Sequence, residues 1–205
     1  MKNVSPASVE DKKFINIGEL KVLRVALGMA KLGSQAFSSM DYVKERLLVL
    51  DSLSELGRVF LDTAPLYGGG FSETVVGNYL KLKRDDFFLA TKFFPSEQET
   101  LSQSIENIKT SLRRLKTEQV DLLQLHWPNA LVDSNLIIDL LGEINNQSLC
   151  RNLGVCNYNF NEIKALEPNE VKYKILTNQI EFNLMTHSLY NRNKIENAAS
   201  VQIAY

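Results

Sequence analysis

Short apolar runs alternate with longer helical segments along this chain, and that alternation limits the folds it can form. The runs are rich in β-branched and aromatic residues and span residues 24–28, 59–61, 87–90, 120–125, 152–155, 175–180 and 201–204. Between them, apolar residues recur with helical periodicity at residues 42–56, 72–82, 101–115, 134–146, 161–166 and 190–199. Repeated strand and helix units of about 30 residues build a parallel sheet. The pattern predicts an α/β fold, either a doubly wound open sheet or a barrel.

Local signals mark where several elements begin and end. Residues 14–23 predict an antiparallel hairpin whose turn contains Gly18. Gly57 is placed to end the first helix, Ser72 with acidic Glu73 to open the second, and Asp133 to cap the fourth. The third helix carries one apolar stripe for packing on the sheet, formed by Leu101, Ile105, Ile108, Leu112 and Leu115.

Composition narrows the partners and the compartment. The chain has 23 basic and 24 acidic residues, so no net field favours nucleic acid or an anionic membrane surface, and we expect a small-molecule partner. No apolar run approaches the roughly 18 residues of a membrane span, and residues 1–13 lack the apolar stretch of a secretory signal. Two cysteines without metal-like spacing imply a reducing compartment, so we predict a cytoplasmic protein. Because no linker divides the chain, residues 1–205 are predicted to form a single domain.

Ionisable side chains follow corresponding ends of three neighbouring strands. Asp62 ends the second run and precedes a loop that carries Tyr67. Lys92 follows the third run, and His126 follows the fourth. In parallel barrels the active site is assembled at the carboxyl ends of the strands. We therefore expect these four side chains to lie together at one end of the sheet.

The motifs around these residues resemble those of the aldo/keto reductase family, in the same order along nearly the whole chain. The matching segments are Asp62-Thr63-Ala64 with Tyr67-Gly68, Thr91-Lys92, Leu125-His126-Trp127-Pro128, Gly154-Val155 with Asn157, and Asn178-Gln179-Ile180-Glu181. The resemblance implies a (β/α)8 TIM barrel, here incomplete with seven of its eight strands and preceded by the hairpin. It also implies an NAD(P)H-dependent oxidoreductase that acts on a small carbonyl or alcohol substrate.

The resemblance assigns a role to each of the four residues. Tyr67 would be the general acid that protonates the carbonyl oxygen as hydride arrives. Because a free phenol has a pKa near 10, Lys92 would be needed to stabilise the phenolate and lower the pKa of Tyr67. Asp62 would keep Lys92 charged and oriented. A neutral His126 would hydrogen-bond the substrate carbonyl.

The family also implies a nicotinamide pocket, which in this sequence comprises Gly28, Met29, Asp62, Cys156, Asn157, Gln179 and Tyr205. Asn157 and Gln179 would hydrogen-bond the carboxamide, and Tyr205 would stack on the ring. Cys156 stands where the family usually has Ser, which is a stronger hydrogen-bonding residue. The resemblance favours NADPH over NAD.

The chain is shorter than a complete barrel of this kind, which typically needs about 250 residues. The missing helix-strand-helix section would hold the residues that clamp the adenosine phosphates. An open barrel leaves two strand edges unpaired. We expect the 205-residue chain alone to be unstable or inactive, unless it forms an oligomer, pairs with a complementing chain or is part of a longer one.

Other interpretations compete with the enzyme. A non-catalytic nicotinamide-nucleotide-binding or regulatory module of the same fold, or an inactive remnant, would have no need of the acid-tuning Lys92. A metal-dependent barrel hydrolase would need several converging histidines, whereas the chain has only His126 and His187, so no metal site is predicted. The identity of the substrate stays open.

Overall fold

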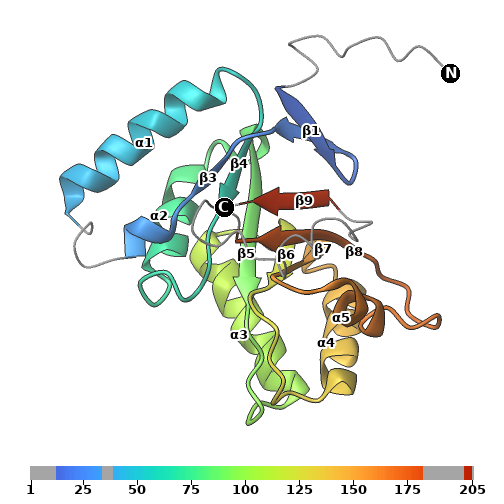
Figure 1. Cartoon of the computed structure of the whole chain (residues 1–205). Helices are drawn as coiled ribbons and strands as arrows, with labels where there is room; N and C mark the ends of the chain where they lie inside the picture. Colours follow the sequence, from blue (N-terminus) through green and yellow to red (C-terminus); the bar gives the residue numbers. More distant parts are fainter. Residues whose placement is uncertain (1–12, 34–38, 182–200, 205) are drawn as a thin grey trace, which may run out of the picture.

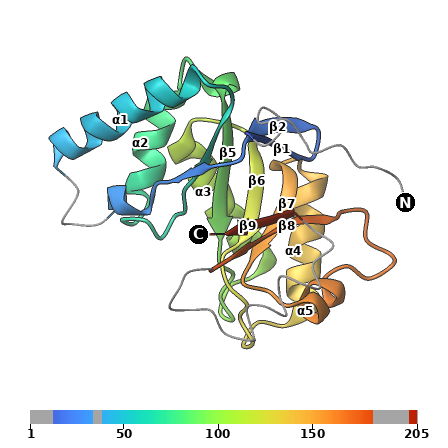
Figure 2. The same cartoon turned by 45° about the horizontal axis from the view of Figure 1, so that its top comes forward.

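A single curled parallel sheet forms the centre of the molecule in the computed structural model, which describes residues 13–33, 39–181 and 201–204 (Figures 1 and 2). Its strands are β3 (Ala26–Gly28), β4 (Val59–Asp62), β5 (Phe87–Phe93), β6 (Val120–Leu125), β7 (Cys150–Cys156), β8 (Ile175–Ile180) and β9 (Val201–Ala204). They are hydrogen-bonded in sequence order, each parallel to the next. A doubly wound sheet reverses its strand order at a switch point, whereas a barrel does not. The described strands are therefore seven of the eight in a (β/α)8 barrel.

Helices cover the outer face of this sheet (Figure 1). They are α1 (Met40–Ser54), α2 (Phe71–Leu80), α3 (Leu101–Leu115), α4 (Ser134–Asn146) and α5 (Phe160–Ala165), with short 3-10 helices η1 (Ala30–Gly33) and η3 (Arg84–Asp86). The stripe predicted on α3 is confirmed: its last four members are buried and Leu101 is half-buried. The helix expected at residues 190–199 lies outside the described residues. None of the described helices is long and apolar enough to cross a membrane.

The helix boundaries confirm one predicted cap and correct another. The Asp133 side chain accepts a hydrogen bond from Asn135 N (2.9 Å) and caps α4 as predicted. The cap predicted at Ser72 is wrong, because α2 begins one residue earlier with Gly70 as its N-cap at φ +91°. Ser72 lies inside the first turn, where its hydroxyl donates to Met29 O (3.0 Å) instead. Gly57 follows α1 in a turn and donates to Ser54 O (3.3 Å), as expected of a residue that ends a helix.

The predicted hairpin is confirmed and closes the amino-terminal end of the barrel. Strands β1 (Phe14–Ile17) and β2 (Leu20–Leu23) pair antiparallel around Gly18, whose φ of +59° favours glycine. Ile17 and Val22 are fully buried and form the inner core of the barrel with Phe60, Phe88, Ala90 and Leu122. A larger apolar core lies between the sheet and the helices. The barrel interior is thus filled with apolar side chains at the hairpin end.

Strand β5 is longer than predicted. Its ladder with β6 continues to the pair Phe93 and Leu125, and all of its residues are buried. Lys92 therefore lies within the strand rather than beyond it. Because side chains alternate between the two faces of a strand, Lys92 points into the barrel while Thr91 faces the helices.

Candidate active site

The predicted site residues Asp62, Lys92 and His126 meet at the carboxyl-terminal end of the barrel. Asp62 ends β4, Lys92 lies near the end of β5, and His126 directly follows β6. All three are buried, with at most 8% of their surface exposed. Parallel strands bring these positions to the same end because their carboxyl ends share one edge of the sheet.

Lys92 makes three hydrogen bonds that use all the hydrogens of its ammonium group. Its Nζ donates to Asp62 Oδ1 (2.6 Å), to the Thr63 carbonyl (3.1 Å) and to the Tyr67 hydroxyl (3.2 Å). The phenol oxygen is the acceptor in the last of these, because an ammonium has no lone pair. The hydroxyl hydrogen of Tyr67 is therefore left for another acceptor.

The pKa of Tyr67 differs from the sequence prediction. Burial raises it above the ordinary value of 10.0, and the Asp62 carboxylate raises it further. Lys92 lowers the pKa, as expected, but by less than burial raises it. The predicted net lowering is therefore wrong. In this site the phenol keeps its proton through neutral pH.

Lys92 stays charged in spite of its burial. Burial alone would lower the pKa of the ammonium, but the nearby Asp62 and Tyr67 outweigh it, and the pKa lies above the ordinary value. A buried charge is tolerated when it is paired and hydrogen-bonded. Asp62 thus holds a cation beside the phenol, as predicted.

His126 is neutral at physiological pH. Burial lowers its pKa to about 4, and the charge on Lys92 lowers it in the same direction. Its ring lies edge-on to Tyr67 at a centroid distance of 6.0 Å and stacks on Trp127 at 6.1 Å. A neutral imidazole has one N–H to donate, so His126 can give one hydrogen bond to an oxygen in the site.

A glycine turn places Tyr67. Gly68, Gly69 and Gly70 all have positive φ angles, of 65°, 60° and 91°, a run that residues with side chains rarely adopt. The turn reverses the chain between β4 and α2, and Ser72 N donates to the carbonyl of Tyr67 (3.2 Å). These angles and contacts give the glycine run a defined conformation.

A chain of side-chain amides supports Asp62 from the other side. Gln179 Nε2 donates to Asp62 Oδ2 (3.0 Å), and Gln179 Oε1 accepts from Gln124 Nε2 (3.2 Å). The thiol of Cys156 lies 3.7 Å from the same Oε1. Sequence reasoning missed Gln124, although a glutamine in a buried strand two residues before His126 was a visible signal. Gly154 makes room for it, because a Cβ there would lie 3.1 Å from Gln124 Cγ and 2.2 Å from Thr177 Oγ1.

A cavity of about 280 Å³ opens beside these groups. It is lined by Gly28, Ala30, Asp62, Tyr67, Lys92, His126, Trp127, Cys156 and Gln179. The structure thus brings the four predicted catalytic residues together with three further predicted cofactor residues, Gly28, Cys156 and Gln179.

Two described residues that were predicted to bind cofactor, Met29 and Asn157, do not line this cavity. Met29 is buried, and its carbonyl accepts from Ser72. Asn157 has a φ of +61°, and its Oδ1 accepts from Glu181 N (3.0 Å). Tyr205 lies outside the described residues.

A curled parallel sheet that brings an aspartate, a lysine, a histidine and a loop tyrosine together at the carboxyl ends of its strands places the chain among the (β/α)8 barrel proteins. Comparison with protein families identifies it further. The model of the aldo/keto reductase family matches residues 24–201. The chain belongs to the aldo/keto reductase family, as the sequence motifs predicted.

Individual relatives are similar over most of this chain. It is 27% identical to the aldo-keto reductase YhdN of Bacillus subtilis over 188 residues, which cover 84% of this chain and 56% of YhdN. It is 28% identical to the methylglyoxal reductase YeaE of Escherichia coli, over 82% of this chain and 60% of YeaE. An aldo/keto reductase structure from Klebsiella pneumoniae in complex with NADP and acetate superimposes with a TM-score of 0.73 at 22% identity, covering 95% of this chain and 68% of that one. The chain thus spans less than two thirds of the length of these two curated relatives.

Proposed function

We propose that this protein reduces small aldehydes or ketones with NADPH, and that Tyr67 is the general acid. The observation that carries the proposal is the contact between Lys92 Nζ and the Tyr67 hydroxyl (3.2 Å), made inside a buried site that opens on a cavity. Family membership supports the same chemistry. A protein that only bound nucleotide would have no use for a buried ammonium beside a phenol.

The residues divide the work of carbonyl reduction. Lys92 fixes the phenol oxygen as an acceptor, so the hydroxyl hydrogen of Tyr67 is available to a carbonyl oxygen in the cavity. His126 donates a second hydrogen bond and orients that oxygen. As Tyr67 gives up its proton, Lys92 stabilises the phenolate that forms. The raised pKa of Tyr67 keeps the acid protonated before each turnover.

The residues of the cavity fit a nicotinamide. When bound, this cofactor supplies the hydride. Gln179 lines the cavity, and of its two amide hydrogens only one is used within the described structure, on Asp62. The other suits a carboxamide oxygen. Among the described residues, a Cβ at Gly28 would meet nothing within 4 Å, so the end of β3 leaves space beside the site.

The test is NADPH consumption with methylglyoxal, chosen because YeaE is a methylglyoxal reductase, by the purified chain and by the same chain completed with the eighth barrel strand. We expect Tyr67→Phe to lower kcat by roughly 10³-fold or more, since it removes the only proposed proton donor. Tyr79→Phe is the matched control, because the Tyr79 hydroxyl binds Asp51 away from the cavity. Undiminished turnover in Tyr67→Phe would remove the proposed acid.

The same assay separates the enzyme from a binding module. NADPH binding without consumption, over a panel of aldehydes and ketones, would favour the non-catalytic alternative. Parallel titrations with NADPH and NADH test the proposed preference for NADPH. We further propose that the protein acts in the cytoplasm on freely diffusing small molecules.

A further inference from the structure

The catalytic strand is held from its outer face as well as its inner one. Thr91 precedes Lys92 on β5, so the two side chains point to opposite faces of the sheet. The Thr91 hydroxyl donates to Glu73 Oε1 of α2 at 2.6 Å. Both Thr91 and Glu73 are fully buried. The backbone beside Lys92 is thus tied to the first turn of α2.

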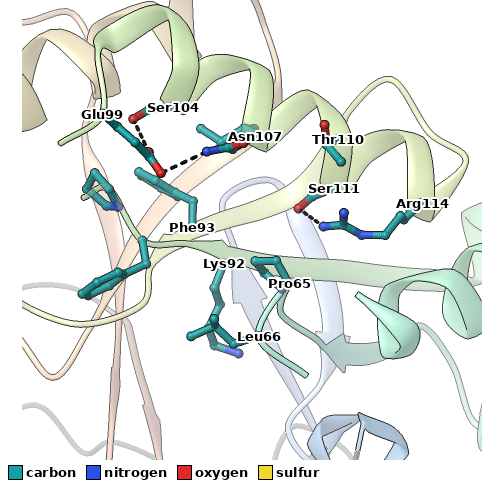
Figure 3. Close-up of a pocket in the computed structure, with 13 residues that line it drawn as sticks. Pro65, Leu66, Lys92, Phe93, Glu99, Ser104, Asn107, Thr110, Ser111 and Arg114 are labelled. Carbon is teal, nitrogen blue, oxygen red and sulfur yellow. Dashed lines mark hydrogen bonds between the residues drawn. The ribbon is translucent and has the colours of Figure 1, made fainter. Parts of the chain in front are cut away.

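Glu73 also receives an arginine from the next helix. Arg114 of α3 donates to Glu73 Oε2 through Nε (2.7 Å) and pairs with the same oxygen through Nη2 (2.6 Å). Nη2 also donates to Ser111 Oγ (2.9 Å), and this second contact fixes the plane of the guanidinium (Figure 3). In Figure 3 the Lys92 side chain points away from α3, on the other side of the strand. Both arginine nitrogens contact the same oxygen, Glu73 Oε2, so that Oε1 is left to accept from Thr91.

Arg114 also packs against the turn that carries Tyr67. A Cβ on Gly70 would lie 2.4 Å from Arg114 Nε and 2.6 Å from its Cδ. The side chain therefore fills the space over Gly70, the last residue of the glycine turn and the N-cap of α2. Glu73 and Arg114 together contact both segments that must be held at a fixed separation: the strand of Lys92 and the turn of Tyr67.

We propose that Glu73 is a positioning residue of the active site, acting through Thr91 on the Lys92 strand and through Arg114 on the Tyr67 turn. This inference rests on the proposed function of Tyr67 and Lys92. Its consequence is that the 3.2 Å contact between their side chains depends on a carboxylate that lies behind the sheet and outside the cavity. Loss of the outer contacts lengthens that contact, and the ammonium then stabilises the phenolate less.

Paired variants separate positioning from mere stability. Thr91→Val keeps the shape of the side chain and removes the donor to Glu73, whereas Thr91→Ser keeps the donor. Glu73→Gln keeps the size and removes the ion pair with Arg114. Asp121→Asn is the control, because Asp121 is a buried carboxylate paired with Arg84 at 2.7 Å, in an ion pair that lies away from the cavity.

Two measurements report on the contact. The first is kcat and KM for methylglyoxal reduction with NADPH. The second needs no turnover: 3-fluorotyrosine is placed at position 67, where its more acidic phenol is titrated by fluorine NMR. We expect Thr91→Val and Glu73→Gln to lower kcat roughly tenfold or more with KM little changed, because small misplacements of catalytic groups are costly. Both variants raise the pKa of the fluorinated phenol, while Thr91→Ser and Asp121→Asn leave it at the wild-type value.

The outcomes distinguish the two proposals. The contrary result is that Thr91→Val and Glu73→Gln each lower the melting temperature while kcat and the pKa of the fluorinated phenol stay as they are in Asp121→Asn. In that case the contacts of Glu73 with Thr91 and Arg114 only stabilise the fold, and this inference is overturned. If Glu73→Gln does not fold, the Thr91→Val and Thr91→Ser pair still decides. If the Tyr67→Phe variant turns over like the wild type, the proposed function fails instead, and the fluorine titration still tests the positioning.

Discussion

Among the described residues three buried carboxylates form salt bridges, and two of them, Asp62 and Asp121, differ in what the paired cations contact. Asp121 binds Arg84 (2.7 Å), Arg151 (3.2 Å) and the backbone N–H of Leu89 (2.8 Å), so its oxygens serve structural contacts near the start of β6. Asp62 pairs with Lys92 at the other end of the strands.

The difference lies in the partners of each cation. The Arg84 guanidinium binds the Asp121 carboxylate and the Phe87 carbonyl, and neither of these acceptors carries a proton that it could give to a substrate. Lys92 gives its third hydrogen to the Tyr67 hydroxyl, a group that can ionise. Burial of a salt bridge therefore does not by itself mark a functional site. The proposed site rests instead on a titratable third partner, the Tyr67 hydroxyl, beside a cavity.

The strongest test of this comparison is Lys92→Met. We expect kcat for carbonyl reduction to fall roughly 10³-fold, because the phenolate loses its counter-charge. Breaking one half of a buried pair leaves Asp62 uncompensated, which costs about 3–5 kcal/mol of stability. Steady-state kinetics and chemical unfolding measure the two effects. A variant that turns over at the wild-type rate contradicts the role of Lys92.

The pH dependence of the reaction rate should follow the titration of Tyr67, which lies at the same end of the strands as Asp62, and should not depend on Asp121. The pKa of Tyr67 lies above 10.0, so the acid is protonated below that value and the reduction rate falls only as pH rises through it. Alcohol oxidation needs the deprotonated phenol and rises over the same range. His126 changes charge only near pH 4, so neither rate has a limb from it around neutrality. An alkaline limb well below pH 10 in the reduction direction would show that the phenol is more acidic than its burial implies.

Near the start of β6, Asp121→Asn should lower the free energy of unfolding without changing the catalytic rate. The substitution keeps an oxygen for Leu89 N but removes the charge that binds Arg84 and Arg151. We expect a loss of about 1–3 kcal/mol in unfolding free energy, with kcat and the pH profile unchanged. A shifted pH profile would mean that the two ends of the barrel are electrostatically coupled.

The smallest expected effect concerns the two cysteines, which also lie at opposite ends of one strand. Burial raises the pKa of both thiols to about 12, so both are neutral. Cys156→Ser gives Gln179 a stronger hydrogen-bonding partner, and we expect NADPH to bind roughly threefold more tightly. Cys150→Ser, at the far end of β7, leaves the affinity unchanged. Fluorescence titration with NADPH measures both, and equal affinities would remove Cys156 from the cofactor site.

Features set by local periodicity and short motifs could be predicted from the sequence. The repeated strand and helix units, the hairpin, and the meeting of Asp62, Lys92 and His126 follow from the alternation of apolar runs and from polar residues at strand ends. The helix cap at Asp133 follows from local chemistry in the same way. These predictions need only neighbouring residues and the general rule for parallel strands. The choice of a barrel over a doubly wound sheet rested on the family resemblance.

Features set by burial and by distant contacts could not be predicted. The direction of the Tyr67 pKa shift depends on desolvation outweighing a nearby charge, which no spacing reveals. Gln179 and Asp62 are 117 residues apart, and Glu73 and Arg114 are 41 apart. The predicted start of α2 was wrong because serine is a common N-cap residue, so Ser72 suited that position. In the structure the Ser72 hydroxyl donates to Met29 O instead.

The hairpin limits the paths by which small molecules can reach and leave the barrel interior. Because Ile17 and Val22 fill the interior at that end, no molecule can pass Tyr67 and leave through the hairpin end. Under the proposed function, the alcohol therefore leaves on the carboxyl-terminal side of the sheet, the side on which the carbonyl compound enters. Product release then has to precede the binding of the next substrate molecule.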